Sequence, residues 1–174
     1  MSTTTNRHQW AVDIMDLGET DQILEIGCGS GTATWLVSQR VTQGKVTAID
    51  KAPVMARRAS RRNAGSIEAG TVEVRCEALE KSELPTAGFD KIFAVNLSLF
   101  WMGDASGHIE RLKELLAPNG RLYVFSERPS VSSVEAIAAR IEAQLRNHDL
   151  TTVRTVTAGI GGYALTCVTA ARRL

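Results

Sequence analysis

The feature that most constrains the fold of this chain is an apolar run that breaks into three alternating glycines. Residues 23–39 read ILEIGCGSGTATWLVSQ, with glycines at positions 27, 29 and 31. The stretch opens with the pattern of a buried strand and closes with that of a helix packed by one stripe. Glycine-rich turns of this kind let a backbone press against a ligand at the start of a helix. The stretch therefore predicts a strand, a ligand-binding turn and a helix in direct succession.

Strand and helix patterns alternate along the rest of the chain. A short amphipathic helix is marked by Trp10, Ile14 and Leu17. We then expect strands at 22–26, 45–50, 71–76, 89–96 and 121–127, with helical segments at 33–41, 53–63, 77–84, 109–116 and 134–145. Ser132 and Glu135 fit a capping box for the last of these helices. The order predicts an α/β fold with a doubly wound, mostly parallel sheet and helices on both faces.

The C-terminal part predicts a different kind of pairing. The runs at 151–157 and 163–171 are joined by a short glycine-rich turn. A connection this short forces antiparallel pairing, so we expect a closing β-hairpin and seven strands in all. With 174 residues and 18.8 kDa the chain has the size of a single domain, 1–174. Its segment 1–17 is expected to be helical and to serve as a lid over the ligand site.

Composition favours no highly charged partner. The net charge is +1, so no strong field attracts nucleic acid or a membrane surface. Four arginines at 57, 58, 61 and 62 share one helix face, which we interpret as solvated surface rather than a nucleic-acid site. The cysteines at 28, 76 and 167 have no spacing typical of a disulfide framework or a zinc site, and no metal is expected. The start of the chain lacks a signal-peptide pattern, and no apolar run reaches membrane length. These features predict a cytoplasmic protein that does not bind membranes.

Asp50 narrows the identity of the ligand. It ends the strand that follows the glycine turn, where a carboxylate can accept hydrogen bonds from both hydroxyls of a ribose. Together the turn and Asp50 predict a nucleoside-bearing cofactor. The dinucleotide pattern G-x-G-x-x-G would need a glycine where Thr32 stands, which disfavours a nicotinamide-dependent oxidoreductase. The sequence also lacks the catalytic Tyr-x-x-x-Lys pair that such an oxidoreductase would need. A non-catalytic module that binds the cofactor is a further alternative.

At these residues the chain resembles the class I S-adenosylmethionine-dependent methyltransferases, over nearly its whole length. "LEIGCGSGT" is similar to the first motif of that family, and "AIDKAPVMARRASRRN" is similar to the second. The resemblance implies a Rossmann-like methyltransferase fold with S-adenosyl-L-methionine as cofactor. It also implies a set of cofactor-binding residues, with the acidic residue of the first motif near the amino group of the cofactor. From these two motifs the set comprises Glu25, Gly27, Cys28, Gly29, Gly31, Asp50, Lys51 and Met55.

Two later segments complete the resemblance. "VRCEALEKSELP" is similar to the third motif and implies that Glu77 and Ala78 contact the adenine. "FDKIFAVNLSLFW" resembles the fourth, and implies that Asn96 faces both cofactor and acceptor. We expect Phe100 and Trp101 to form an apolar wall of the acceptor pocket. The segment "NLSL" departs from the N-P-P-Y-like signature of enzymes that methylate planar nitrogens.

The implied activity is methyl transfer to a small-molecule acceptor by in-line displacement. The donor carries its own activation, so the protein mainly has to align and desolvate the reactants. A general base is needed only for acceptors that must lose a proton, and Asn96 is the one catalytic candidate. Because few residues are left over for a lid, either the acceptor is small or a partner subunit completes the pocket. A homo-oligomer is therefore one possibility that the sequence leaves open.

Overall fold

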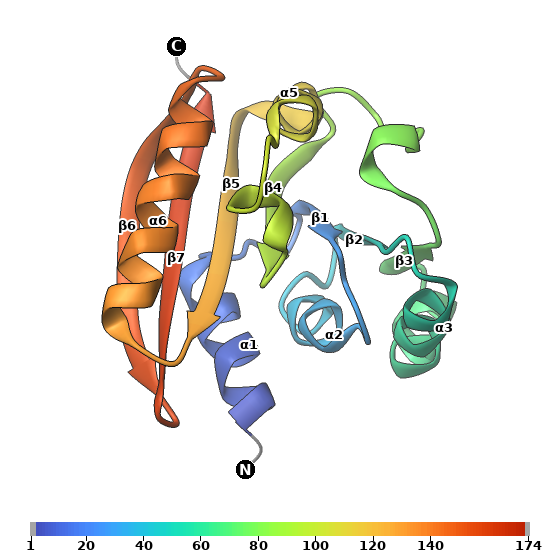
Figure 1. The fold of residues 1–174 in the computed structure, drawn as a ribbon. Coiled ribbons are helices and arrows are strands. Elements are labelled where there is room, and N and C mark those ends of the chain that lie inside the picture. The colour runs from blue at the N-terminus through green and yellow to red at the C-terminus, as the bar shows by residue number, and fades with distance from the viewer. Residues whose placement is uncertain (1–2, 173–174) are drawn as a thin grey trace.

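A computed structural model of the chain describes residues 3–172, with side chains from Arg7 onward (Figure 1). The strands are β1 (Gln22–Ile26), β2 (Lys45–Ile49), β3 (Val72–Arg75), β4 (Phe89–Val95), β5 (Leu116–Arg128), β6 (Leu150–Ile160) and β7 (Tyr163–Arg172). The helices are α1 (Thr3–Ile14), α2 (Thr32–Ser38), α3 (Pro53–Arg62), α4 (Ala64–Glu68), α5 (Ser106–Leu115) and α6 (Val131–Arg146), with 3-10 turns η1 (Leu79–Lys81) and η2 (Ser98–Phe100). Within the described residues, no helix combines the length and the apolar character that crossing a membrane requires.

The strands form one seven-stranded sheet in the order β3-β2-β1-β4-β5-β7-β6. β1 lies between β2 and β4 and pairs with both in parallel. β7 enters between β5 and β6 and is antiparallel to both. The predicted Rossmann-like fold, with its antiparallel C-terminal hairpin, is confirmed. Because the strand order reverses at β1, the carboxyl ends of β1 and β4 flank the crevice where such sheets bind ligands.

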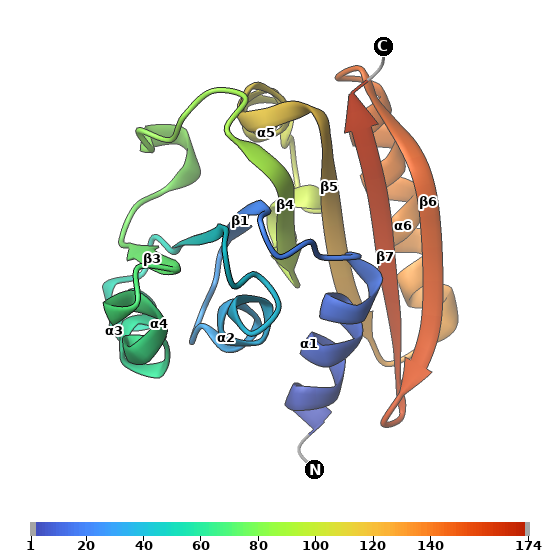
Figure 2. The same ribbon diagram turned by 180° about the vertical axis from the view of Figure 1, so that it is seen from behind.

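The central strands β1, β4, β5 and β7 send their side chains alternately into two large cores, because successive residues of a strand point to opposite faces. One core is covered by α1 and α2, and the other by α5 and α6 (Figures 1 and 2). The first takes Ile23, Phe93, Tyr123 and Cys167 from the sheet. The second takes their neighbours Leu24, Ile92, Leu122 and Val168. This double burial explains why the central strands read as nearly continuous apolar runs.

The structure corrects three local expectations. The capping box at Ser132 and Glu135 is wrong, because α6 starts one residue before Ser132 and its N-cap is Ser130. The hydroxyl of Ser130 accepts a hydrogen bond from the N–H of Ser133 at 3.3 Å. β5 begins at Leu116 instead of 121, since Leu116 already pairs with Phe89 ahead of a bulge. A short helix, α4, follows α3 and was not predicted.

The expected N-terminal helix lies within segment 1–17, of which residues 1 and 2 are outside the described part. Its last described turns are well packed: Ala11, Val12 and Met15 are buried in the core beside α2. The hydroxyl of Tyr123 in β5 donates to the carbonyl of Met15 at 3.2 Å. This C-terminal end of the helix therefore belongs to the packed body of the protein, next to the sheet.

Candidate functional site

The three glycines of the turn adopt left-handed backbone conformations at the carboxyl end of β1. The φ angles of Gly27, Gly29 and Gly31 are 66°, 54° and 73°. Residues with a Cβ rarely adopt this region, so the turn needs glycine. A Cβ at Gly31 would lie 2.8 Å from the Cα of Ala59, whereas one at Gly29 would meet no protein atom within 4 Å. Gly31 therefore permits close packing of α3, and Gly29 leaves open space at the turn.

Hydrogen bonds fix the turn to β2 and α3. The N–H of Cys28 donates to the carbonyl of Ile49 at 3.0 Å. The side-chain amide of Asn63 donates to the carbonyl of Gly31 at 3.1 Å and to that of Ala59 at 2.9 Å. Asn63 is 1% exposed. Sequence reasoning missed this residue, although a polar side chain at the end of an expected helix was a weak signal for it.

The structure brings Asp50 against the turn. Its Oδ2 accepts from the N–H of Gly29 at 2.8 Å, and its Oδ1 accepts from the N–H of Ala52 at 2.8 Å. The side chain is half-buried. Each carboxylate oxygen offers two lone pairs, so both keep the capacity to accept from a ligand. Asp50 thus holds the turn to the end of β2 and still has acceptor sites for hydroxyl groups.

Glu25 lies inside the protein, one strand residue before Ile26 and the turn. It is 2% exposed, and its Oε2 accepts from the hydroxyl of Thr34 at 2.5 Å. Burial raises the pKa of this carboxyl to about 8, the hydrogen bonds from Thr34 lower it in part, and the charge of Asp50 adds to the rise. At neutral pH the buried carboxyl therefore holds a proton. Thr34, in the first turn of α2, is the second residue that sequence reasoning missed.

The residues expected to contact the adenosine part lie after β2 and β3. Lys51 is exposed, and Met55 is half-buried in the first turn of α3. Glu77 and Ala78 are both half-buried, and Oε1 of Glu77 lies 3.8 Å from Nη1 of Arg75. Arg75 is thus a neighbouring cation of this carboxylate, whose buried Oε1 makes no hydrogen bond to the described residues. The assignment of these residues to a cofactor stays a prediction.

Asn96 connects the carboxyl ends of β4 and β5 to the N-terminal helix. It has a positive φ of 55°, and its Oδ1 accepts from the N–H of Glu127 at 2.7 Å. The carboxylate of Glu127 lies 3.2 Å from Nη1 of Arg7 in α1. Trp10 packs edge-on against Phe125, with ring centroids 5.8 Å apart. α1 therefore borders the edge of the sheet at which Asn96 lies.

The prediction that Phe100 forms a wall of an acceptor pocket is wrong. Phe100 is 0% exposed and packs in the core under α5 and α6. The short η2 turn directs this residue inward, whereas the next residue, Trp101, reaches the surface of that core. The indole of Trp101 lies under Arg128, whose Cζ is 4.7 Å from the ring centroid. The place of Trp101 in an acceptor pocket stays a prediction.

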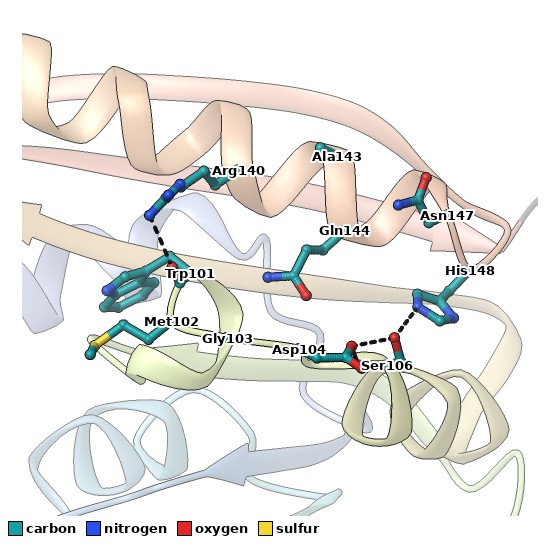
Figure 3. A pocket seen from close by; sticks show the side chains of 10 residues that line it. All are labelled: Trp101, Met102, Gly103, Asp104, Ser106, Arg140, Ala143, Gln144, Asn147 and His148. Atoms are coloured by element: carbon teal, nitrogen blue, oxygen red, sulfur yellow. Dashed lines mark hydrogen bonds between the residues drawn. The ribbon is translucent and has the colours of Figure 1, made fainter.

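A groove of about 680 Å³ runs between α6 and the loop that follows η2 (Figure 3). Trp101, Met102 and Arg140 line one end, and Asp104, Ser106 and His148 line the other. Both ends of the loop are held by one side chain of α6. The Nε2 of Gln144 donates to the carbonyl of Phe100, and its Oε1 accepts from the N–H of Ala105, both at 3.0 Å. This groove was not predicted from the sequence.

The order of elements, the glycine turn and the aspartate after β2 coincide with a match to a known family. The family model described as a methyltransferase domain matches residues 23–120, more than half of the chain. The chain belongs to the class I S-adenosylmethionine-dependent methyltransferases. The trans-aconitate 2-methyltransferase of Paracidovorax citrulli is 30% identical over 151 residues, which are 84% of this chain and 56% of that protein. The chain thus spans about half the length of this curated relative.

Solved structures share the fold of this methyltransferase-family chain. A SAM-dependent methyltransferase from Aquifex aeolicus has a TM-score of 0.77 at 22% identity, covering 94% of this chain and 88% of that one. The cyclase SpnF has a TM-score of 0.81 at 14% identity, covering 98% and 82%. At such identities the likeness concerns the fold alone. The cyclase shows that the same fold also occurs in a protein named for another activity.

Among the described side chains around the turn, none is an activated nucleophile and none belongs to a metal-ligand cluster. Burial, together with the charges of Glu25 and Asp50, raises the pKa of the Cys28 thiol well above its usual range, so the thiol stays protonated. In the described part of the chain, no group of three or more His, Cys, Asp or Glu residues is placed to hold a metal ion. Cys28 therefore acts as a small buried residue of the turn.

We expect Glu25→Gln to make the free energy of unfolding less dependent on pH. The pKa of this carboxyl is 4.5 in the unfolded chain and about 8 in the folded one, so folding retains a proton that the unfolded chain releases. The contribution of this group to the free energy of unfolding is therefore fully present below pH 4.5 and is lost as the pH rises towards 8. The loss amounts to up to about 1.4 kcal/mol per pH unit. Urea unfolding at several pH values in this window measures the slope. Glu135→Gln, on the exposed side of α6, should leave the slope unchanged, and equal slopes for Glu25→Gln and the parent would contradict the assignment.

Proposed function

We propose that this chain transfers a methyl group from S-adenosylmethionine to a small-molecule acceptor. The observation that carries the proposal is the open space at Gly29 beside the Asp50 carboxylate, within a match to the methyltransferase domain over residues 23–120. S-adenosylmethionine supplies a methyl group that its sulfonium has already activated. The residues of the chain then have to bind, align and exclude water.

The residues at the turn fit this cofactor. Gly29 would accommodate the methionine part, because a side chain there would occupy the space in front of the turn. Asp50 would accept hydrogen bonds from the ribose hydroxyls with the acceptor capacity that its two backbone bonds leave free. The buried carboxyl of Glu25 would bind the amino group of the cofactor, directly or through water. The positive charge of that amino group favours the ionised form of the carboxyl. Lys51, Met55 and the pair at 77 and 78 would flank the adenosine.

The acceptor would approach along the carboxyl ends of β4 and β5. The Oδ1 of Asn96 accepts from the N–H of Glu127. Its Nδ2 takes no part in that bond and can donate to an acceptor molecule there. Segment 1–17 would border this entrance through the ion pair of Arg7 with Glu127, and would act as the lid of a single domain. The cytoplasmic location and a homo-oligomer stay predictions.

Titration calorimetry with S-adenosylhomocysteine tests the proposal, with NAD(H) and NADP(H) titrated alongside. We expect saturable, micromolar binding of S-adenosylhomocysteine and none of the nicotinamide cofactors. Binding of a nicotinamide cofactor instead would favour the oxidoreductase alternative. If S-adenosylhomocysteine binds but the protein consumes no S-adenosylmethionine with any acceptor in a broad panel of small molecules, the result would favour the non-catalytic alternative. Neither finding is compatible with the full proposal.

A further inference from the structure

We propose that the groove between α6 and the loop after η2 binds a methyl acceptor that carries a carboxylate or a phosphate group. Arg140, which lines the Trp101 end of the groove, would hold that anion, with Arg128 next to it over the Trp101 ring. This inference rests on the proposed function and names the substrate class that the function leaves open. It is carried by the position of the groove, by Arg140 in its wall with Arg128 nearby, and by the way its walls are fixed.

The Trp101 end of the groove lies near the edge of the sheet that holds the cofactor site. Trp101 follows Asn96 by five positions, through the η2 turn at the carboxyl end of β4. Its ring also lies 4.7 Å from Arg128, the last residue of β5. Since β4 and β5 are parallel neighbours, their ends meet at one edge. An acceptor held at Trp101 is therefore positioned beside the ends of these two strands.

Two guanidinium groups contact Trp101, that of Arg140 at its carbonyl and that of Arg128 at its ring. Arg140 donates from Nη1 to the Trp101 carbonyl at 3.4 Å, as Figure 3 shows, and Arg128 donates from Nη1 to the Glu127 carbonyl at 2.6 Å. Within residues 7–172, neither has a carboxylate oxygen within 4.0 Å. Arg128 is half-buried, where a cation without a carboxylate partner is uncommon. The planar fork of arginine suits bidentate binding of a carboxylate or phosphate, and both groups retain free N–H donors for it.

The walls of the groove are fixed before any ligand binds. Gln144 bonds both ends of the loop, at Phe100 and Ala105. At the far end, Nε2 of His148 lies 3.1 Å from the hydroxyl of Ser106, and its Nδ1 lies 2.8 Å from Glu110. A site that needs little ordering on binding loses less affinity to conformational entropy.

The charges along the groove give the acceptor a direction. The far end carries the exposed carboxylate of Asp104, which accepts from the N–H of Ser106 at 2.8 Å. The near end carries Arg140 and the side chain of Met102, which is 68% exposed, and Arg128 lies next to it over the Trp101 ring. An anionic group is therefore drawn to the Trp101 end, and apolar atoms of the acceptor find Met102 beside it.

Nuclear magnetic resonance of the isotope-labelled full chain with S-adenosylhomocysteine tests the inference. Succinate and glycerol phosphate are the anionic probes, and succinamide and glycerol are their neutral matches. We expect saturable shifts of the amides of Trp101 to Ser106 with one or both anions and none with the neutral molecules. The anion that binds more tightly identifies carboxylate or phosphate as the source of the charge. Absence of shifts in these amides with both anions would overturn the inference.

Variants distinguish a built site from general attraction of anions. Arg140→Gln and Arg128→Gln should each weaken anion binding at least tenfold, without changing the affinity for S-adenosylhomocysteine. Arg146→Gln is the matched control, because Arg146 is exposed on the same helix and does not line the groove. Equal losses in Arg140→Gln and Arg146→Gln would overturn the inference. Should Arg128→Gln fail to fold, the exposed Arg140 keeps the test valid.

The failure of this inference differs from a failure of the proposed function. If S-adenosylhomocysteine binds and anions leave the groove unperturbed, the function stands and the acceptor class is wrong. If S-adenosylhomocysteine does not bind, the function fails, and the same anion titration on the free chain decides whether the groove is an anion site. A turnover assay adds a kinetic readout, because loss of Arg140 should raise KM for an anionic acceptor more than it lowers kcat.

Discussion

Replacing Gly29 with valine is expected to abolish binding of S-adenosylhomocysteine while the chain stays folded. A Cβ at this position meets no protein atom within 4 Å, so a branched side chain would fill the space proposed for the cofactor. The φ angle of 54° makes the substitution strained, at a cost of about 1–2 kcal/mol that a domain of this size can tolerate. Titration calorimetry measures the affinity, and circular dichroism with thermal unfolding measures the fold.

Gly31→Val is the matched comparison within the same turn. A Cβ there would lie 2.6 Å from the side-chain amide of Asn63 and 2.8 Å from the Cα of Ala59. We therefore expect this variant to lose stability, because α3 has to move away from the turn. Retained binding of S-adenosylhomocysteine in a folded Gly29→Val protein would remove the turn from the cofactor site.

Replacing Asp50 with alanine is expected to weaken binding of S-adenosylhomocysteine at least tenfold. The ribose would lose one or two charge-assisted hydrogen bonds, each worth about 1.5–3 kcal/mol. The turn would also lose the acceptor that fixes the N–H of Gly29. Both effects act in the same direction. Calorimetry with the parent and the variant measures the change in affinity.

Asp90→Ala separates the ligand effect from a general loss of a backbone-bonding carboxylate. The Oδ2 of Asp90 accepts from the N–H of Gln22 at 2.8 Å, at the start of β1 and so at the opposite end of that strand. This variant should bind S-adenosylhomocysteine as the parent does. An Asp50→Ala protein with unchanged affinity would take Asp50 out of the site.

The fold could be predicted because its signals are local and repeated. The apolar run before Gly27 and the short connection between the last two strands each allow one arrangement only, given how parallel and antiparallel strands connect. The start of α6 could not be read in the same way. Serines stand at positions 130, 132 and 133, and all of them suit an N-cap chemically. Which one caps depends on where Pro129 and the end of β5 leave the chain.

The site was predictable at the turn and less so around it. Gly29 and Asp50 follow strands directly, so the sheet itself brings them together. Asn63 and Thr34 act through contacts with distant backbone and carboxyl atoms, and nothing in their own neighbourhood announces this. Phe100 was misjudged because "LFW" is apolar throughout. Only the packing of η2 under α6 decides that Phe100 is buried and that Trp101 reaches the groove.

The division of the interior into two cores has a consequence for how such a chain can diverge. The turn packs with β2 and α3 in a small cluster of Cys28, Ala48 and Ala59, which borders the core under α1 and α2 through Val74. The groove is built from η2, α5 and α6 over the other core. Substitutions at distant positions without shared partners add their effects nearly independently. Mutations that reshape the groove for a new acceptor are therefore absorbed on one side of the sheet. The half that holds the shared cofactor can stay constant while descendants of this chain acquire different substrates.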